Sequence, residues 1–356
     1  MKKILLLYTE IAPYLMAGVE RLVKEHGAEV HIVCWPVNKE APFQFRAMQR
    51  IHMYDRTRYD RMALLRFVET LRPDVILASG WIEPDYMAAC AAARKRGIPT
   101  VMAMDPQWTG SLKQWATVAL RRSVLSRTFS HAWVPGHAQA RYARRLGFRA
   151  DRIMLGCYTA DLDLFAPLAD RFLAAKAAHF PHRFLSVARY LKIKGHPYME
   201  EAFAELCDAG EAGDWELWCI GTGDLFPSAL QHPRVKHLGF VQADQVWKYQ
   251  EQCGVFVLAS LYEAWGVAVH EHAAAGFPLI LSNVVGAHER FLEEGRNGWR
   301  FRAGDKESLK RAYRAAIAVS DAELLAMGRR SAELGRSWGP AQWAATLMQV
   351  IDQGHG

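Results

Sequence analysis

The chain has 356 residues, of which 51% are hydrophobic and 23% charged. This composition is typical of a globular protein and excludes a disordered chain or a fibrous repeat. The length favours two domains. No apolar run approaches the roughly 20 residues of a membrane-spanning helix, so we expect no integral membrane protein. The opening apolar run ends at Thr9 and Glu10 without a cleavage site, which predicts a buried first strand of a cytoplasmic protein.

Positive charge is concentrated in the first half of the chain. Residues 1–180 hold 26 Lys and Arg against 16 Asp and Glu, whereas residues 181–356 carry a net negative charge. This asymmetry predicts an anionic partner for the first half. Zinc-finger spacing, RNP-like sequence and basic-region heptads are all absent, so we expect no nucleic acid partner. An anionic membrane surface and a phosphorylated substrate both remain open. The six cysteines lie far apart in sequence and are expected to be small core residues.

The segment from Ser111 to Val134 combines apolar residues at helical spacing with Lys and Arg. A basic amphipathic helix that contains Trp115 can lie in a membrane interface. The same pattern also fits an ordinary surface helix that packs its apolar stripe on a sheet. The sequence leaves both interpretations open.

Short aliphatic runs alternate with helical stretches along the first half. This alternation predicts a parallel, doubly wound sheet. The expected strands are Ile4–Tyr8, Val30–Trp35, Val75–Ser79, Thr100–Ala103 and Ala132–Val134. The expected helices between them are Tyr14–His26, Ala63–Leu71, Tyr86–Arg96 and His137–Leu146.

The alternation restarts after a Pro- and Ala-containing stretch from Phe165 to His182, which we interpret as a linker. We therefore expect an N-terminal domain over residues 1–166, a C-terminal domain over residues 182–335, and a final helix within 336–356 that could pack on either domain. The expected strands are Phe184–Ala188, Glu216–Ile220, Val235–Leu238, Val255–Leu258 and Leu279–Ser282. The expected helices are His196–Asp208, Ala243–Gln252, Ala268–Ala275, Ser308–Ile317 and about Pro340–Gln353.

Two cations and two glycines follow strands of the second half. Arg189 comes just after one strand, and Lys194 precedes a helix five residues later. Ligands of open parallel sheets bind beyond the carboxyl ends of the strands, and two cations placed there suit a diphosphate. Gly221 and Gly223 follow the next strand, where glycines let the backbone approach a ligand closely.

The most informative stretch runs from Ser260 to Pro278. Free N–H groups at the start of its helix, around Trp265, Gly266 and Val267, can bind phosphate oxygens. Glu263 precedes this helix and Glu271 lies within it. Eight residues at helical rise would separate the two carboxyl groups by roughly 12 Å, too far for a glycosidase pair. The pair suits an extended ligand with a group at each end.

This Glu-x7-Glu stretch resembles the signature of retaining glycosyltransferases of family 4 with the GT-B fold, in which two Rossmann-like domains face each other across a cleft. Arg189 and Lys194 match the family's phosphate-binding pair, and the glycines match its G-x-G turn. Further matches are Lys236–Phe240, Gly286, Glu289 and Asn297-Gly298. The resemblance covers most of residues 183–303. The segment Trp35–Phe43 and the Ser79-Gly80-Trp81 loop are similar to enzymes of bacterial surface-polysaccharide assembly.

The resemblance implies a role for each of these residues. Glu271 would hold the ribose hydroxyls of a nucleotide-sugar donor, Glu263 would meet the donor sugar, and Arg189 and Lys194 would neutralise the leaving diphosphate. Neither a cofactor nor a metal is expected. Asp161-Leu162-Asp163 looks like a metal motif, but it matches the family's domain-linking segment, so we expect it to be structural.

The first domain departs from the family pattern. The usual Gly-Gly loop is replaced by Thr9–Tyr14, followed only by Gly18, and Asp105 stands where some members have a His. Asp105 could orient the acceptor or contact the donor sugar, or it could cap the next segment.

The sequence therefore predicts a cytoplasmic, metal-independent retaining glycosyltransferase and leaves open a peripheral position at the inner face of a membrane. Its donor would be a nucleotide-diphosphate sugar and its acceptor a glycan or lipid-linked glycan of a bacterial polysaccharide such as O-antigen, capsule or exopolysaccharide. The alternatives are a nucleotide-sugar epimerase on the same fold and a non-catalytic protein that binds nucleotide sugars or membranes.

Overall fold

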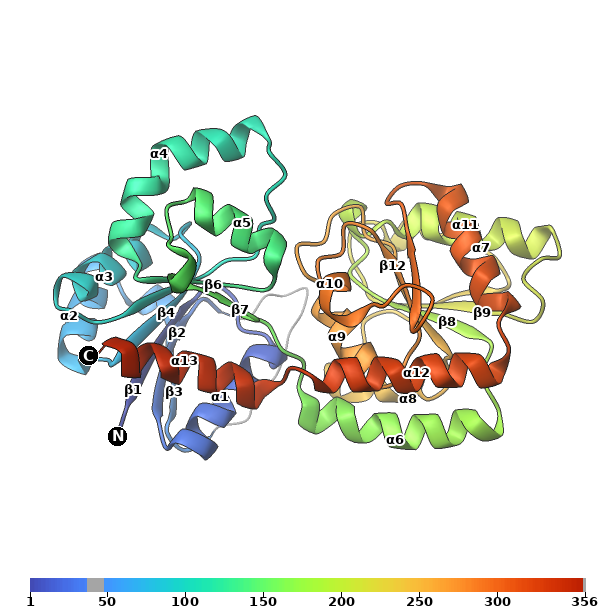
Figure 1. The fold of residues 1–356 in the computed structure, drawn as a ribbon, viewed down its shortest axis with the longest axis horizontal. Coiled ribbons are helices and arrows are strands. Elements are labelled where there is room, and N and C mark those ends of the chain that lie inside the picture. The colour runs from blue at the N-terminus through green and yellow to red at the C-terminus, as the bar shows by residue number, and fades with distance from the viewer. Residues whose placement is uncertain (37–47, 355–356) are drawn as a thin grey trace. The chain divides into compact units, whose positions relative to one another are not determined.

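The computed structural model describes residues 1–36 and 48–354 and divides the chain into two compact units (Figure 1). The N-terminal unit comprises Met1–Thr159 with Gly339–Gly356, and the C-terminal unit comprises Ala160–Trp338. Each unit is an α/β layer structure with its own core. The expected fold class is confirmed: both sheets are parallel throughout their described pairings.

The N-terminal unit is built on a seven-stranded sheet in the order β3-β2-β1-β4-β5-β6-β7. Apolar clusters cover both of its faces, which explains why its central strands are continuous aliphatic runs. The strands are β1 (Lys3–Tyr8), β2 (Glu29–Cys34), β3 (Ile51–Asp55), β4 (Val75–Ser79), β5 (Thr100–Ala103), β6 (His131–Val134) and β7 (Ile153–Leu155). The helices are α1 (Pro13–His26), α2 (Arg61–Leu71), α3 (Pro84–Lys95), α4 (Leu112–Thr128), α5 (His137–Arg145) and α13 (Pro340–Gly354).

The C-terminal helix α13 packs against α1 within the N-terminal unit. The Trp343 ring stacks on Trp133 with 4.8 Å between centroids, and its indole N–H donates to the carbonyl of Cys157. A Cβ on Gly18 would come within 2.5 Å of the Trp343 ring. Gly18 is therefore required for this helix packing, not for a loop near a ligand.

The C-terminal unit has a six-stranded sheet in the order β10-β9-β8-β11-β12-β13. Its strands are β8 (Arg183–Val187), β9 (Glu216–Ile220), β10 (Val235–His237), β11 (Val255–Leu258), β12 (Leu279–Ser282) and β13 (Gly298–Phe301). Its helices are α6 (Leu162–Ala178), α7 (His196–Asp208), α8 (Trp247–Gln250), α9 (Val267–Ala274), α10 (His288–Phe291), α11 (Lys306–Ala318) and α12 (Asp321–Arg336).

The interpretation of Phe165–His182 as a linker was wrong, because most of it belongs to α6. This helix buries Phe165, Ala169, Phe172 and Lys176, a spacing that places them on one face against α9 and α12. Pro167 lies inside the helix and removes only one N–H donor. The Asp161 side chain accepts from the Asp163 N–H at the start of α6, as expected for a structural motif. The division between the units falls at Thr159, whereas the sequence suggested residue 166.

Helix α4 does not pack a full apolar stripe on the sheet. Only Leu125 and Thr128 near its end are buried, and most of the helix stands away from the sheet at the margin of the N-terminal unit (Figure 1). Leu112 and Leu120 are 88% and 77% exposed. Within the described part of the chain, no helix combines the length and apolar character that crossing a membrane requires.

Candidate active site

The candidate site lies where the strand order of the C-terminal sheet reverses, between β8 and β11. At such a point the loops that follow the two strands separate and leave a crevice. Here those loops surround a hollow of about 150 Å³. It is lined by Val187, Ala188, Arg189, Lys194, Leu258, Glu263, Gly266, Val267 and Ala268. The structure therefore brings together Arg189, Lys194, Glu263, Gly266 and Val267, all of which the sequence singled out.

Lys194 and Glu263, which both line this hollow, form an ion pair. Their side chains are only 18% and 14% exposed, so the pair is shielded more than a surface salt bridge and its charges interact more strongly. The Ser260 hydroxyl also donates to the Glu263 carboxylate at 3.2 Å. The pair fixes the ammonium of Lys194 at the wall of the hollow, where an oxygen of a bound diphosphate could also form an ion pair with it.

Gly195 holds the turn that carries Lys194. Its φ of 73° lies in the left-handed region, and a Cβ there would come within 2.2 Å of the carbonyl oxygen of Ala259. A side chain at this position would push the Lys194 turn away from the loop after β11. The sequence pattern did not predict that position 195 requires glycine.

Helix α9 begins at the hollow. Gly266 precedes it with φ 97°, and Val267 is its first residue. The first N–H groups of an α-helix have no partner one turn earlier, so this end favours anions. Trp265 has a different role, because its ring is 3% exposed and packs edge-on against Phe291. Its side chain is part of the core, and only its backbone lies near the start of the helix.

Gly221 and Gly223 pack against the loop that carries Arg189. A Cβ on Gly221 would come within 2.0 Å of the carbonyl oxygen of Ala188, and one on Gly223 would come within 2.9 Å of that of Tyr190. Both have positive φ values. Close packing against the loop of Arg189 explains these glycines without a ligand. Their contact with a donor stays a prediction.

Glu271 lies one turn beyond Val267 and so on the same side of α9. Burial raises the pKa of its carboxyl to about 7, and the charge of Asp161 adds to the effect. Among the described residues, none donates a hydrogen bond to this carboxylate. A desolvated carboxyl without a hydrogen-bond donor favours binding of a ligand whose hydroxyl groups can donate to it. Helix α9 starts at Val267, so Glu263 precedes it as expected, and the separation of the two carboxyl groups stays a prediction.

Asp105 belongs to the N-terminal unit and follows β5 at the carboxyl edge of that sheet. Its carboxylate accepts from the Tyr158 hydroxyl at 3.3 Å. It does not cap the next helix, because Ser111 is the N-cap residue of α4. The Ser79 side chain also lies at this edge, where it accepts from the N–H of Thr9. Within the N-terminal unit, Ser79 and Asp105 therefore make the carboxyl edge of the sheet polar.

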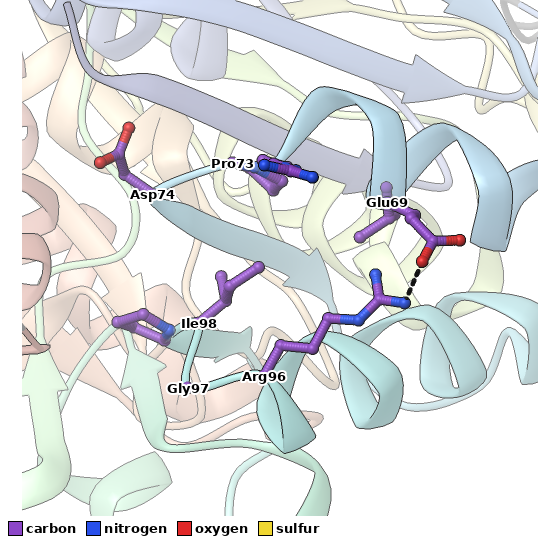
Figure 2. A pocket seen from close by; sticks show the side chains of 9 residues that line it. Glu69, Pro73, Asp74, Arg96, Gly97 and Ile98 are labelled. Carbon is purple, nitrogen blue, oxygen red and sulfur yellow. Dashed lines mark hydrogen bonds and ion pairs between the residues drawn. The ribbon is translucent and has the colours of Figure 1, made fainter.

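A larger hollow of about 570 Å³ lies elsewhere in the N-terminal unit (Figure 2). It is lined by residues from the end of α2 to Asp74 and from Arg96 to Pro99, at the edge where β4 and β5 begin. Arg96 and Glu69 form an ion pair across part of its wall (Figure 2). It holds none of the predicted site residues and lies at the edge opposite Asp105.

Asn297 matches the family pattern but has a structural role. Its side chain is fully buried and bonded to the backbone of Glu293 and Phe291 and to the Ser331 hydroxyl. Gly298 begins β13, where a Cβ would collide with Leu279. Part of the segment Trp35–Phe43, which pointed to polysaccharide enzymes, lies outside the described residues.

Comparison with known proteins decides the family. The profile described as "Glycosyl transferase 4-like domain" matches residues 9–157, and that described as "Glycosyl transferases group 1" matches residues 181–318. Together they cover more than half of the chain. The chain belongs to the GT4-type glycosyltransferases with the GT-B fold. The expectation drawn from the Glu-x7-Glu stretch is therefore confirmed at the level of the family.

Individual relatives agree with this GT4 membership. The amylovoran biosynthesis glycosyltransferase AmsK of Erwinia amylovora is 34% identical over 146 residues, which are 37% of this chain and 35% of AmsK. The chain thus matches about a third of the length of this curated relative. Two solved structures share the fold. Anabaena HepE, crystallised with UDP and glucose, has a TM-score of 0.74 at 14% identity, with 99% and 100% of the two chains covered. Sucrose-phosphate synthase of Thermosynechococcus elongatus has a TM-score of 0.72 at 18% identity, with 99% of each chain covered.

Proposed function

We propose that this GT4-type protein transfers a hexose-type sugar from a nucleotide-diphosphate donor to a glycan or lipid-linked glycan during bacterial polysaccharide biosynthesis. The observation that carries the proposal is the hollow at the strand reversal, where Lys194, Arg189 and the start of α9 converge. AmsK is an amylovoran biosynthesis glycosyltransferase and HepE was crystallised with UDP and glucose, so the similarity to them supports the proposed acceptor and donor classes.

The chemistry follows from charge. As the bond between sugar and diphosphate breaks, negative charge builds up on the leaving oxygens, and fixed cations or N–H groups stabilise that charge most. Arg189 offers a planar fork and Lys194 a point charge. The start of α9 adds oriented N–H groups. This set supports a reaction that needs no metal ion and no cofactor.

Glu263 and Glu271 have different environments and so different roles. Glu263 is held by Lys194 and Ser260 at the wall of the hollow, from which it could meet the donor sugar. The desolvated carboxyl of Glu271 suits the ribose hydroxyls. Asp105 would act from the N-terminal unit on the acceptor or the donor sugar. The retaining outcome rests on the family resemblance alone.

A transfer assay tests this function against its alternatives. The protein is incubated with a nucleotide sugar and lipid-linked glycan, and the product linkage is determined by NMR. The proposal expects nucleotide diphosphate to be released only with acceptor present and the new linkage to keep the donor's anomeric configuration. Conversion of the sugar without acceptor would favour an epimerase. Donor binding without any turnover across acceptors would favour a non-catalytic protein.

Helix α4 supports a peripheral position at the anionic inner face of a membrane. Leu112, Leu120 and Val124 are exposed and lie at multiples of four residues, so they share one face. Eight Lys and Arg and no Asp or Glu lie in residues 106–150. Exposed apolar groups surrounded by positive charge fit an anionic lipid surface.

Vesicle sedimentation tests this position. Binding to vesicles that contain phosphatidylglycerol is expected to fall at least about tenfold in a Leu112→Glu, Leu120→Glu variant, because two buried leucines contribute several kcal/mol. Met62→Glu is the matched control, since Met62 is an exposed apolar residue of α2 in the same unit. Equal binding of all three proteins would contradict the role of α4.

A further inference from the structure

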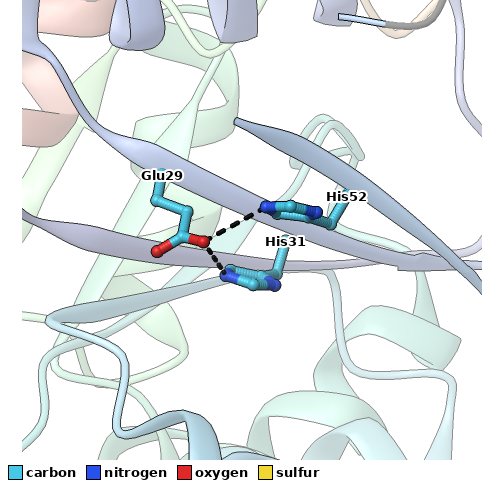
Figure 3. Close-up of side chains that lie close together, drawn as sticks. All are labelled: Glu29, His31 and His52. Atoms are coloured by element: carbon cyan, nitrogen blue, oxygen red, sulfur yellow. Dashed lines mark hydrogen bonds and ion pairs between the residues drawn. The ribbon is translucent and has the colours of Figure 1, made fainter. Parts of the chain in front are cut away.

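A cluster of three metal-ligand side chains lies on β2 and its neighbour β3 in the N-terminal unit, away from the candidate active site. Glu29 and His31 are two residues apart on β2, so they point to the same face of the sheet. His52 on β3 is paired with His31 in the parallel register. Figure 3 shows one oxygen of the Glu29 carboxylate facing a nitrogen of each imidazole, with the two rings stacked on each other.

The spacing of the ligand atoms fits one small cation. The Glu29 carboxylate oxygen Oε1 lies 3.1 Å from Nε2 of His52 and 3.6 Å from Nε2 of His31. Two atoms bound to one tetrahedral zinc ion at about 2.0–2.1 Å stand roughly 3.3–3.4 Å apart. The two measured separations bracket this value. The three ligand atoms all lie within 4.8 Å of one another. The two rings are stacked, with 4.7 Å between their centroids, so the exposed His52 ring has to turn about its side-chain bonds to direct its lone pair at the same ion.

His31 provides a second, independent observation. Its side chain is 8% exposed, and its Nε2 atom is buried with no hydrogen-bond partner among the described residues. The other ring nitrogen, Nδ1, lies 2.9 Å from the Tyr54 hydroxyl. If Nδ1 carries the proton and donates it to Tyr54, the lone pair of Nε2 points at a carboxylate oxygen. With this tautomer two acceptors face each other at 3.6 Å, and a cation bound between them would satisfy both.

The second ring nitrogen of His31 has a partner of the kind that a metal ligand needs, because Nδ1 lies beside the Tyr54 hydroxyl. Metal-ligating histidines commonly have a hydrogen-bond partner on the second nitrogen that fixes ring orientation, and Tyr54 is placed to be that partner.

We propose that Glu29, His31 and His52 form a site for one divalent transition-metal ion of the zinc type. Imidazole and carboxylate ligands suit Zn²⁺ and its neighbours better than Mg²⁺ or Ca²⁺, which prefer oxygen alone. The His52 side chain is 44% exposed, so the ion enters from solvent and keeps a fourth position for water. Because β3 ends the order of the sheet, the ion would clamp this edge strand to β2.

The site is tested by metal binding to the whole chain after removal of any purification tag and of metal with EDTA. Titration with Co²⁺, followed by its visible absorption, and competition with Zn²⁺ are expected to show one ion per chain. His52→Ala is expected to weaken binding at least about tenfold, because it removes one of three ligands. His26→Ala, which removes an exposed histidine of the same unit, is expected to leave binding unchanged.

Thermal unfolding gives a second readout. Zn²⁺ is expected to raise the Tm of the wild type and of His26→Ala but not that of His52→Ala, since a ligand of the folded state stabilises it by mass action. Saturable binding that is the same in His52→Ala, or no binding of either ion to the folded wild type, would overturn the proposal. A Tyr54→Phe variant that binds several-fold more weakly, with the same stoichiometry, would support the orientation of His31.

Discussion

Nucleotide-sugar binding is expected to strengthen as the pH rises from about 6 to 8, because Glu271 becomes ionised in this range. A carboxyl with a pKa of about 7 is one-eleventh ionised at pH 6 and ten-elevenths ionised at pH 8. If the ribose hydroxyls donate to the ionised form, the dissociation constant falls about tenfold over these two pH units, or about 1.4 kcal/mol.

Isothermal titration calorimetry with UDP-glucose, or with whichever nucleotide sugar binds, measures this slope directly. The diphosphate of a nucleotide sugar has no free terminal phosphate and does not titrate in this range, so the slope reports the protein. Glu271→Gln keeps the shape of the side chain and removes its titration. We expect this variant to bind more weakly at pH 8 and with no pH dependence. A wild-type affinity that is flat with pH, or a slope retained in Glu271→Gln, would refute the assignment of Glu271 to the ribose.

Three further predictions concern stability, each measured by urea unfolding. Because the pKa of Glu271 is raised to about 7, the folded state holds this proton between about pH 4.5 and 7, where the unfolded state has lost it, and stability falls as the pH rises through this window. The free energy of unfolding of Glu271→Gln is therefore expected to exceed that of the wild type by about 1–3 kcal/mol at pH 8 and to equal it at pH 4. Burial lowers the pKa of Lys176 to about 7, so between pH 7 and 10.5 the unfolded state binds more protons, and stability falls as the pH is lowered through that window. At pH 7 the free energy of unfolding of Lys176→Met should exceed that of the wild type by about 2–4 kcal/mol. An unchanged urea midpoint would contradict this. Gly18→Ala would place a methyl group 2.5 Å from the Trp343 ring and should cost about 1–3 kcal/mol, whereas a neutral effect would show that α13 yields easily.

The sequence predicts the central strands well because they are buried on both faces. β4, β5, β9, β11 and β12 match the expected bounds, since each is an aliphatic run closed by polar or small residues. The strands that were missed, β3, β7 and β13, are all edge strands of their sheets. β3 alternates apolar residues with His52 and Asp55, and β13 is short and contains Arg300. Edge strands bury less surface, so their hydrophobic signal is weaker.

Among the described helices, α6, α10 and α12 were missed, and the two long ones were missed for different physical reasons. In α6, a proline inside the helix and a buried lysine interrupt the apolar pattern, so the helical spacing of Phe165, Ala169 and Phe172 was not recognised. Helix α12 packs mostly small residues against α9, so it lacks a clear apolar stripe. Its capping box, Ser320 with Glu323, was a signal that the sequence offered.

The candidate site was predictable in outline but not in its electrostatics. Strand ends and glycine spacing located Arg189, Lys194, Glu263 and the start of α9, because parallel strands bring their carboxyl ends to one edge. The Lys194–Glu263 ion pair joins residues 69 positions apart, and the sequence carries no signal for their contact. Nor does the sequence show the burial that raises the pKa of Glu271, since burial depends on how α9 and α6 pack.

We expect the hollow beside α9 to bind a nucleotide diphosphate through Lys194, and binding of UDP, GDP and ADP in EDTA, with CMP as control, tests this most directly. Lys192→Ala is the matched control, because Lys192 is an exposed lysine two residues away on the same turn. We predict selective binding of one diphosphate without metal. This binding is kept in Lys192→Ala and weakened about 10- to 100-fold in a folded Lys194→Ala protein, as expected for a lost charge-assisted hydrogen bond. Binding that is equal in both variants, or no binding of any diphosphate to the folded wild type, would contradict it.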